Sequence, residues 1–172
     1  MTSEAEPLTL VLVGPMAAGK TSVGRRVARR LRVAFIDTDK RVVAEHGPIP
    51  AIFAEHGEAH FRDLERAAVA VALAEGGVIS LGGGAVTDAG TRELLRAHPV
   101  VFLTVSPEAV ADRIRGSSRP LLAGEDPLAR WQAIFDERRG WYDEVSSTTF
   151  DTSRRPMQRI ADEIVAWRRE QR

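Results

Sequence analysis

The most specific chemical signal in the sequence is a run of eight residues: Gly14, Pro15, Met16, Ala17, Ala18, Gly19, Lys20 and Thr21. Two glycines separated by four residues and followed by Lys and then Ser or Thr form the phosphate-binding P-loop pattern. In such a loop the backbone N–H groups face a phosphate, Lys20 reaches the outer phosphates of a nucleotide, and Thr21 offers its hydroxyl to Mg²⁺. The alternative is a chance glycine turn. The chain has only two lysines, Lys20 and Lys40, and one falls where the pattern requires it.

Two carboxylates, Asp37 and Asp39, follow the short apolar run at residues 33–36. If strand geometry persists through them, both side chains lie on the same side of the sheet. There they could serve Mg²⁺ and a reacting hydroxyl beside the P-loop. The alternative is a turn and helix cap, because Asp and Thr favour such positions.

Glycines and arginines supply further candidates. The run Gly82, Gly83, Gly84 lets the backbone come close to a ligand, and a flexible loop is the alternative. Arg119 lies in a polar, turn-rich segment that we expect to be mobile, where an arginine can close over a transferring phosphate. Arg62, Arg138 and Arg139 fall in helical patterns, for which solvated charge is the default interpretation. The pair His56 and His60 lacks the glutamate spacing of a zinc helix and predicts surface histidines.

The pattern along the chain alternates strands and helices. Apolar strands are expected at residues 8–13, 33–36, 78–81, 100–105 and 148–150, with helices between them and at residues 156–169. This alternation predicts an α/β fold with a parallel sheet covered on both faces. Ligands bind such sheets beyond the carboxyl ends of the strands. The P-loop, the two aspartates and the triple glycine all follow strands, so they should converge on one edge of the sheet.

Composition narrows the classes of function. The chain has 172 residues, a formal net charge of +0 and no cysteine. These numbers favour one domain, argue against a general attraction to nucleic acid or an anionic membrane, and exclude disulfides and thiolate sites. The acidic first residues and the short apolar run after them do not resemble a signal peptide or a membrane span, so a cytoplasmic protein is expected.

Taken together, these motifs resemble the shikimate kinase family, a member of the nucleoside-monophosphate-kinase group of P-loop folds. The resemblance runs from about residue 10 to residue 156 in the family's order. Its matching pieces are the P-loop, Asp37-Thr38-Asp39, Phe61-Arg62 with Glu65, the triple glycine, Arg119-Pro120-Leu121-Leu122, and Arg138 with Tyr142.

The resemblance implies a three-layer fold with a five-stranded parallel sheet of order 2-3-1-4-5. It also implies one kinase domain over residues 1–172, with a substrate-binding region at about 38–66 and a lid at about 116–127. The reaction would transfer the γ-phosphoryl group of ATP to the 3-hydroxyl of shikimate, with Mg²⁺ as cofactor. Neither nucleic acid nor membrane is an expected partner, and the family precedent is a monomer.

The resemblance also assigns roles by position. Catalysis would use Lys20, Asp39 and Arg119. Thr21 would ligate Mg²⁺ directly, and Asp37 would hold it through water. Shikimate would be bound by Asp39, Arg62, Gly82, Gly83, Gly84 and Arg138. ATP would be bound by Gly14, Pro15, Met16, Ala17, Ala18, Gly19, Lys20, Thr21, Ser22, Arg113, Arg119 and Arg155.

Two departures and two alternatives remain open at this point. Ala17-Ala18 replaces the Gly-Ser or Gly-Ala often seen in the family, a change we expect to be harmless. Arg139-Gly140-Trp141 replaces a frequent Ala-Pro-Leu, so either Arg138 or Arg139 could face the substrate, with Arg138 favoured. One alternative function is another small-molecule kinase of this fold, such as a gluconate kinase. The other is a catalytically silent nucleotide-binding module.

Overall fold

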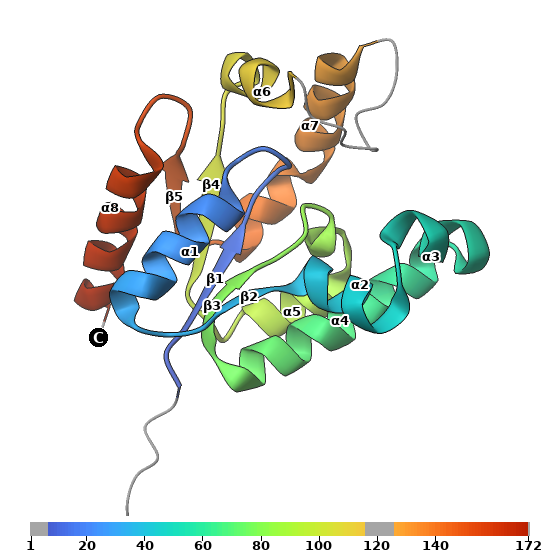
Figure 1. Ribbon diagram of the computed structural model, residues 1–172, viewed down its shortest axis with the longest axis horizontal. Helices are drawn as coiled ribbons and strands as arrows, with labels where there is room; N and C mark the ends of the chain where they lie inside the picture. Colours follow the sequence, from blue (N-terminus) through green and yellow to red (C-terminus); the bar gives the residue numbers. More distant parts are fainter. Residues whose placement is uncertain (1–6, 116–125, 172) are drawn as a thin grey trace, which may run out of the picture.

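Five parallel strands form the centre of the computed structural model, which describes residues 7–115 and 126–171. The strands are β1 (Thr9–Val13), β2 (Phe35–Asp37), β3 (Gly77–Ser80), β4 (Val100–Thr104) and β5 (Thr148–Asp151). They pair in the order β2-β3-β1-β4-β5, which confirms the predicted sheet (Figure 1). Arg119 and most of the predicted lid lie outside the described residues.

Eight α-helices and one short 3₁₀ helix occupy the described ranges and form the outer layers of the fold. They are α1 (Lys20–Leu31), α2 (Thr38–His46), α3 (Ile49–His56), α4 (Glu58–Glu75), η1 (Ala85–Thr87), α5 (Ala89–Leu95), α6 (Pro107–Ile114), α7 (Pro127–Val145) and α8 (Met157–Glu170). Helices α1 and α8 pack against each other, while α4 and α5, and α5 and α7, pack together in the other layer. Helices α2 and α3 project beyond the edge of the sheet (Figure 1).

Local sequence explains where these elements begin and end. All five residues of β1 are buried, as a central strand between two helical layers requires. Asp88, Ser106 and Asp126 cap α5, α6 and α7 by accepting hydrogen bonds from backbone N–H groups in the first turn. Each cap satisfies a donor that the helix itself leaves unpaired, so the loops after β3 and β4 are fixed where they enter their helices.

Of the two interpretations of Asp37 and Asp39, the structure supports the helix cap. Strand geometry does not persist from Asp37 to Asp39: β2 ends at Asp37, and Asp39 lies in the first turn of α2. The Asp37 side chain accepts a hydrogen bond from the Lys40 amide at 3.2 Å and caps α2. The tendency of Asp to cap helices therefore prevails over the alternation of a strand, and the two carboxylates are separated by a helical start.

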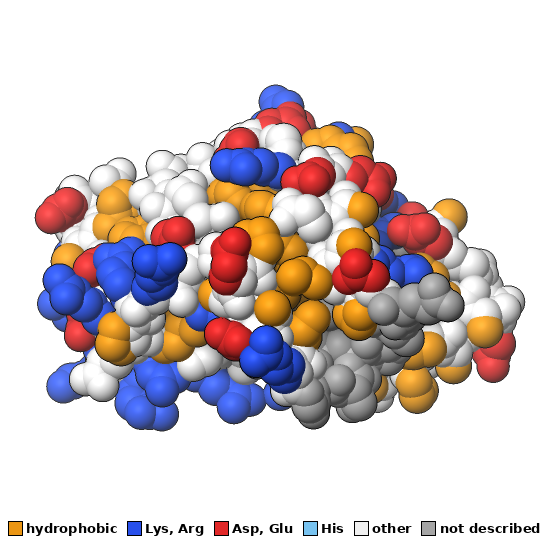
Figure 2. Space-filling view, turned by 90° about the horizontal axis from the view of Figure 1, so that it is seen from above, with side chains coloured by type: hydrophobic (Ala, Val, Ile, Leu, Met, Phe, Trp, Pro, Cys, Tyr) orange, Lys and Arg blue, Asp and Glu red, His pale blue; other side chains and the backbone are white. Residues whose placement is uncertain are grey.

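Charged side chains are unevenly distributed over the surface, although their charges sum to a formal net charge of +0. Figure 2 shows Lys and Arg side chains most densely at the lower left of the view, with acidic side chains spread over the whole face. Within residues 7–115 and 126–171, no helix is long and apolar enough to cross a bilayer.

Two helical glycines lead to opposite predictions. A Cβ on Gly140, in the exposed middle of α7, would meet no atom within 4 Å, whereas a Cβ on Gly24 in α1 would lie 2.5 Å from the Phe35 ring. Gly140→Ala should raise the free energy of unfolding by about 0.5–1 kcal/mol, since Ala favours helix. Gly24→Ala should lower it by about 1–3 kcal/mol through overpacking. Urea unfolding of both variants measures this; equal signs would contradict the packing of β2 on α1.

Candidate active site

The phosphate loop (residues 14–19) has its carbonyl groups tied to the surrounding protein. Lys20 Nζ donates to the oxygens of Gly14 at 2.7 Å and Pro15 at 3.0 Å. The next three carbonyls accept hydrogen bonds from three different elements. Trp131 Nε1 of α7 reaches Met16 O at 2.8 Å, Arg113 Nη1 of α6 reaches Ala17 O at 2.8 Å, and Thr152 Oγ1 reaches Ala18 O at 2.7 Å.

These ties orient the amides of the loop. In a planar trans peptide the N–H points opposite to the C=O, so outward-held carbonyls of residues 16–18 direct the amides of residues 17–19 to the other side. Ala17 adopts φ 68° and Gly19 φ 90°, both left-handed. Such a turn can gather N–H groups into an anion-binding concavity at the start of α1. The Ala18 amide also donates to Pro15 O within the loop, at 3.2 Å. For Ala17 the left-handed conformation costs roughly 1–2 kcal/mol, so its presence there is not neutral for stability.

Asp39 lies at the centre of the site. Its side chain is mostly buried, and within the described residues its Oδ1 has no hydrogen-bond partner. Burial raises the pKa of Asp39, the neighbouring Asp37 adds to the rise, and Lys20 and Arg62 oppose it. A Cβ on Gly82 would lie 2.4 Å from Asp39 Oδ1. A side chain at the first residue of the triple glycine would therefore displace this carboxylate from its position.

Arg62 of α4 is held within the protein, contrary to its default interpretation as a solvated residue. Its side chain is only 13% exposed, and its Nη1 donates to Glu65 at 2.8 Å, while Glu65 is 1% exposed. The more exposed Glu58 accepts from Nη2 at 3.3 Å. A Cβ on Gly84 would lie 2.4 Å from Arg62 Nη2, so the guanidinium rests on the last residue of the triple glycine. Arg62 Nε has no hydrogen-bond partner among the described residues.

Arg138 and Tyr142 of α7 approach the same glycines from another side. The nearest Arg138 atom to a Cβ on Gly83 would be Nη1 at 3.7 Å. The Tyr142 hydroxyl donates to Gly83 O. Arg139, in contrast, is exposed and lies over the Phe135 ring at 5.8 Å. Of the two adjacent arginines, the structure thus brings Arg138 and not Arg139 to the site.

The residues predicted to contact ATP are less uniformly placed. Arg113 borders the phosphate loop and also hydrogen bonds Thr152, and burial lowers its pKa. Arg155 pairs with Glu163 of α8. The hydroxyl of Ser22 accepts from Arg26 Nη1 at 2.6 Å. Thr21 is partly exposed in the first turn of α1.

Two residues that support the phosphate loop were not predicted to do so. Trp131 is 2% exposed, and its indole N–H fixes Met16 O. Thr152 is fully buried just after β5 and had no sequence signal. A signal did exist for α7, because Trp131, Phe135, Arg138 and Tyr142 recur at i, i+4, i+7 and i+11 on one helix face. An arginine within an aromatic stripe indicates a buried polar contact.

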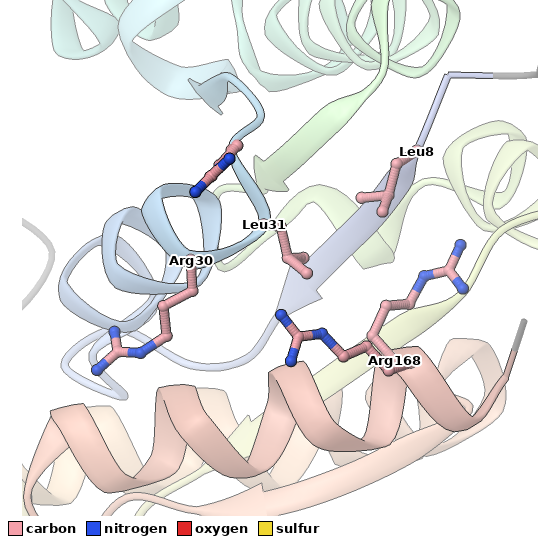
Figure 3. Close-up of a pocket in the computed structure, with 6 residues that line it drawn as sticks. Leu8, Arg30, Leu31 and Arg168 are labelled. Carbon is pink, nitrogen blue, oxygen red and sulfur yellow. The ribbon is translucent and has the colours of Figure 1, made fainter.

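A separate cavity of about 330 Å³ lies elsewhere and is lined by Leu8, Arg30, Leu31, Arg32, Arg168 and Arg169 (Figure 3). Its arginines stand at the C-terminal ends of α1 and α8, and Arg30 pairs with Asp162 at 2.5 Å. Cations at this end of a helix complement its dipole. The cavity contains none of the residues predicted to bind ligands.

A phosphate loop at the end of β1, facing a carboxylate and two arginines around a glycine turn, defines a P-loop phosphotransferase for a small acceptor. The family model described as shikimate kinase matches residues 16–169. The chain belongs to the shikimate kinase family.

Individual proteins agree with this family assignment. The chain is 49% identical over 158 residues to a shikimate kinase of Saccharopolyspora erythraea, covering 90% of each chain. The structure resembles that of the Acinetobacter baumannii shikimate kinase in complex with shikimate, with a TM-score of 0.87, 33% identity, and coverage of 96% of this chain and 95% of that one. A gluconokinase from Sinorhizobium meliloti has a TM-score of 0.66 at 23% identity, with 98% and 95% coverage, a likeness of fold alone.

The buried Glu65 generates a prediction about pH. Burial raises its pKa from the ordinary 4.5 to about 7, although Arg62 acts in the opposite direction. The stabilising contribution of the protonated form is therefore complete below pH 4.5 and is lost as the pH rises through about 7. Relative to Glu65→Gln, the free energy of unfolding of the unmodified protein should fall by on the order of 3 kcal/mol between pH 4 and pH 8.

Urea unfolding across this pH range measures the difference. The matched control is Glu58→Gln, which alters an exposed carboxylate that pairs with the same arginine. The free energy of unfolding of that variant should change with pH nearly as it does for the unmodified protein. If the Glu65→Gln curve did so too, burial would not be controlling the charge of Glu65.

Proposed function

We propose that the chain transfers the γ-phosphoryl group of ATP to the 3-hydroxyl of shikimate, giving shikimate 3-phosphate and ADP. The observation that carries the proposal is the buried Oδ1 of Asp39, which has no hydrogen-bond partner among the described residues. The positive charges of Lys20 and Arg62 both act on this carboxylate. Lys20 directly follows the phosphate loop as the first residue of α1, and Arg62 is one of the two arginines that border the glycines. An acceptor with a hydroxyl at one end and a carboxylate at the other suits this order.

The carboxylate of the acceptor would be bound by Arg62 and Arg138. Both guanidinium groups border the triple glycine. Forked N–H donors bind two carboxylate oxygens at once, which fixes the acceptor's orientation as well as its position. Phosphoryl transfer needs such positioning and charge neutralisation more than covalent chemistry.

Asp39 would accept a hydrogen bond from the attacking hydroxyl and take its proton as the bond to phosphorus forms. The raised pKa of Asp39 brings its basicity closer to that of a general base working near neutral pH. Its neighbour Gly82 provides the room for the carboxylate to remain beside the acceptor.

Oxygen donors near the phosphate loop fit Mg²⁺. Among the described residues no group of three His, Cys, Asp or Glu side chains could enclose a metal. Mg²⁺ instead suits one or two protein oxygens together with phosphates and water. Thr21 would be the direct ligand and Asp37, whose Oδ1 caps α2, would act through water. When bound, Mg²⁺ would neutralise charge on the outer phosphates.

The remaining nucleotide contacts are proposed by position. The amides of the phosphate loop and Lys20 would hold the phosphates, and Ser22 would extend this contact into α1. Arg113 and Arg155 would flank the adenine, supported by Arg113's place against Ala17 O. Arg119 would approach the phosphates from the lid at about residues 116–127.

Release of ADP from ATP and Mg²⁺ tests the function. With shikimate present, we expect release to rise far above the background measured with ATP alone. Gluconate and nucleoside monophosphates serve as control acceptors and should leave the background unchanged. Release with one of these controls would retain the kinase and reject shikimate. Folded protein that binds ATP but releases no ADP with any acceptor would indicate a silent nucleotide-binding module.

Two substitutions should separate chemistry from acceptor binding. Asp39→Asn should lower kcat roughly 10²–10⁴-fold with nearly unchanged ATP binding, because the hydroxyl loses its base. Arg62→Ala should mainly raise the KM for shikimate, by roughly 2–5 kcal/mol in binding if the carboxylate is left buried and unpaired. Steady-state kinetics with each substrate varied, together with ATP-induced thermal shifts, measure the split. An Arg62→Ala enzyme with unchanged KM and kcat for shikimate would remove the main support for this acceptor.

A further inference from the structure

Helix α7 donates a side-chain hydrogen bond to each of the two loops of the site. Near its start, Trp131 Nε1 donates to Met16 O of the phosphate loop at 2.8 Å. Near its end, the Tyr142 hydroxyl donates to Gly83 O of the glycine loop (residues 82–84). The two donors lie eleven residues apart, close to three full turns, and so share one face of the helix.

Packing holds the Tyr142 ring in one place. Tyr142 is 1% exposed, and its ring stacks on Phe102 of β4 with centroids 5.1 Å apart and an interplanar angle of 25°. The Phe135 ring packs near both of these rings, with its centroid 6.3 Å from that of Tyr142 and 6.4 Å from that of Phe102. A ring fixed by β4 and by its own helix can aim its hydroxyl only in a narrow range of directions.

The glycine loop needs such a fixed point. With no Cβ at Gly83 or Gly84, the peptide between them can rotate at small steric cost. Among the described residues, neither the Gly83 nor the Gly84 amide donates a hydrogen bond that would hold it. A hydrogen bond to Gly83 O fixes this peptide, and planarity then directs the Gly84 N–H away from the Tyr142 hydroxyl.

We propose that Tyr142 is a positioning residue for acceptor binding: its hydroxyl holds the peptide of Gly83 and Gly84 so that the loop amides meet the acceptor carboxylate beside Arg138. The inference rests on the proposed function, because it assumes that the glycine loop binds the acceptor. Tyr142 does not touch the acceptor; it acts through the peptide that it orients.

The protonation of Tyr142 is consistent with this role. Burial raises its pKa to about 12, and the nearby Arg138 acts in the opposite direction. The hydroxyl therefore keeps its proton, and remains a donor to Gly83 O, throughout the pH range in which the site would work.

The test is the variant Tyr142→Phe, which keeps the ring and removes the hydrogen bond. We expect the KM for shikimate to rise about tenfold, as for one lost hydrogen bond in a buried site, with the KM for ATP changed less than about twofold. The matched control is Trp131→Phe, which removes the other α7 donor. It should raise the KM for ATP more than the KM for shikimate.

The outcomes are distinguishable. Failure of the proposed function would be seen first in the unmodified protein, as no ADP release that depends on shikimate. If the unmodified protein is active and Tyr142→Phe retains its KM for shikimate, the positioning role is wrong. It is equally wrong if both variants raise both KM values alike, since that pattern reports only loss of structure.

If Tyr142→Phe does not fold, a measurement on the unmodified protein can test the proposal instead. Tyr142 is the only tyrosine of the chain, so tyrosine labelled with ¹³C at Cζ gives one NMR signal that reports on its hydroxyl. Titration with shikimate should shift this signal more than titration with a non-hydrolysable ATP analogue. A signal indifferent to shikimate, from protein that binds it, would overturn the proposal.

Discussion

The hydrogen bonding of the phosphate-loop carbonyls is the constraint on which the rest of the site depends. Five successive carbonyls, from Gly14 to Ala18, accept hydrogen bonds from side chains of the protein. The donors come from α6, α7, the end of β5 and the lysine that directly follows the loop. The position of each of these elements relative to β1 is therefore set by a polar contact with one turn of backbone, in addition to the apolar core behind it.

The arrangement around the glycine loop depends on the lack of side chains at its glycines as much as on the charges beside it. Asp39 and Arg62 reach the glycine loop at distances that a Cβ on Gly82 or Gly84 would prevent. Positive and negative charges alternate in this cluster. Lys20 and Arg62 lower the pKa of Asp39, and Arg62 and Arg138 lower that of Glu65, each against the effect of burial. A buried cluster of this kind is weak evidence for stability, because desolvation opposes the attraction of its charges. Its arrangement suits the anionic, hydroxylated acceptor proposed above.

Local patterns predicted the elements well, and long-range contacts account for what was missed. Buried strands, Asp and Ser caps and the glycine loop after β3 all have signals within a few residues, and resemblance to a family supplied the strand order. Burial of Glu65 had no such signal, since a Glu three residues after Arg62 is equally typical of a solvated helix face. Thr152 and Trp131 bind carbonyls more than 100 residues away, at Ala18 and Met16. Periodicity carries no information about such partners.

Because Trp131 and Tyr142 stand on the same helix, α7 sets the spacing of the two loops whose carbonyls they bind. Eleven residues at the α-helical rise correspond to about 16 Å along the axis. Adding or deleting one residue between them would turn Tyr142 about 100° around the helix, away from Gly83. Insertions and deletions in this family should thus be excluded from the stretch between these two residues, while remaining acceptable in exposed connections such as the turn before α3. The length of α7 between these two residues is therefore constrained by the positions of both loops.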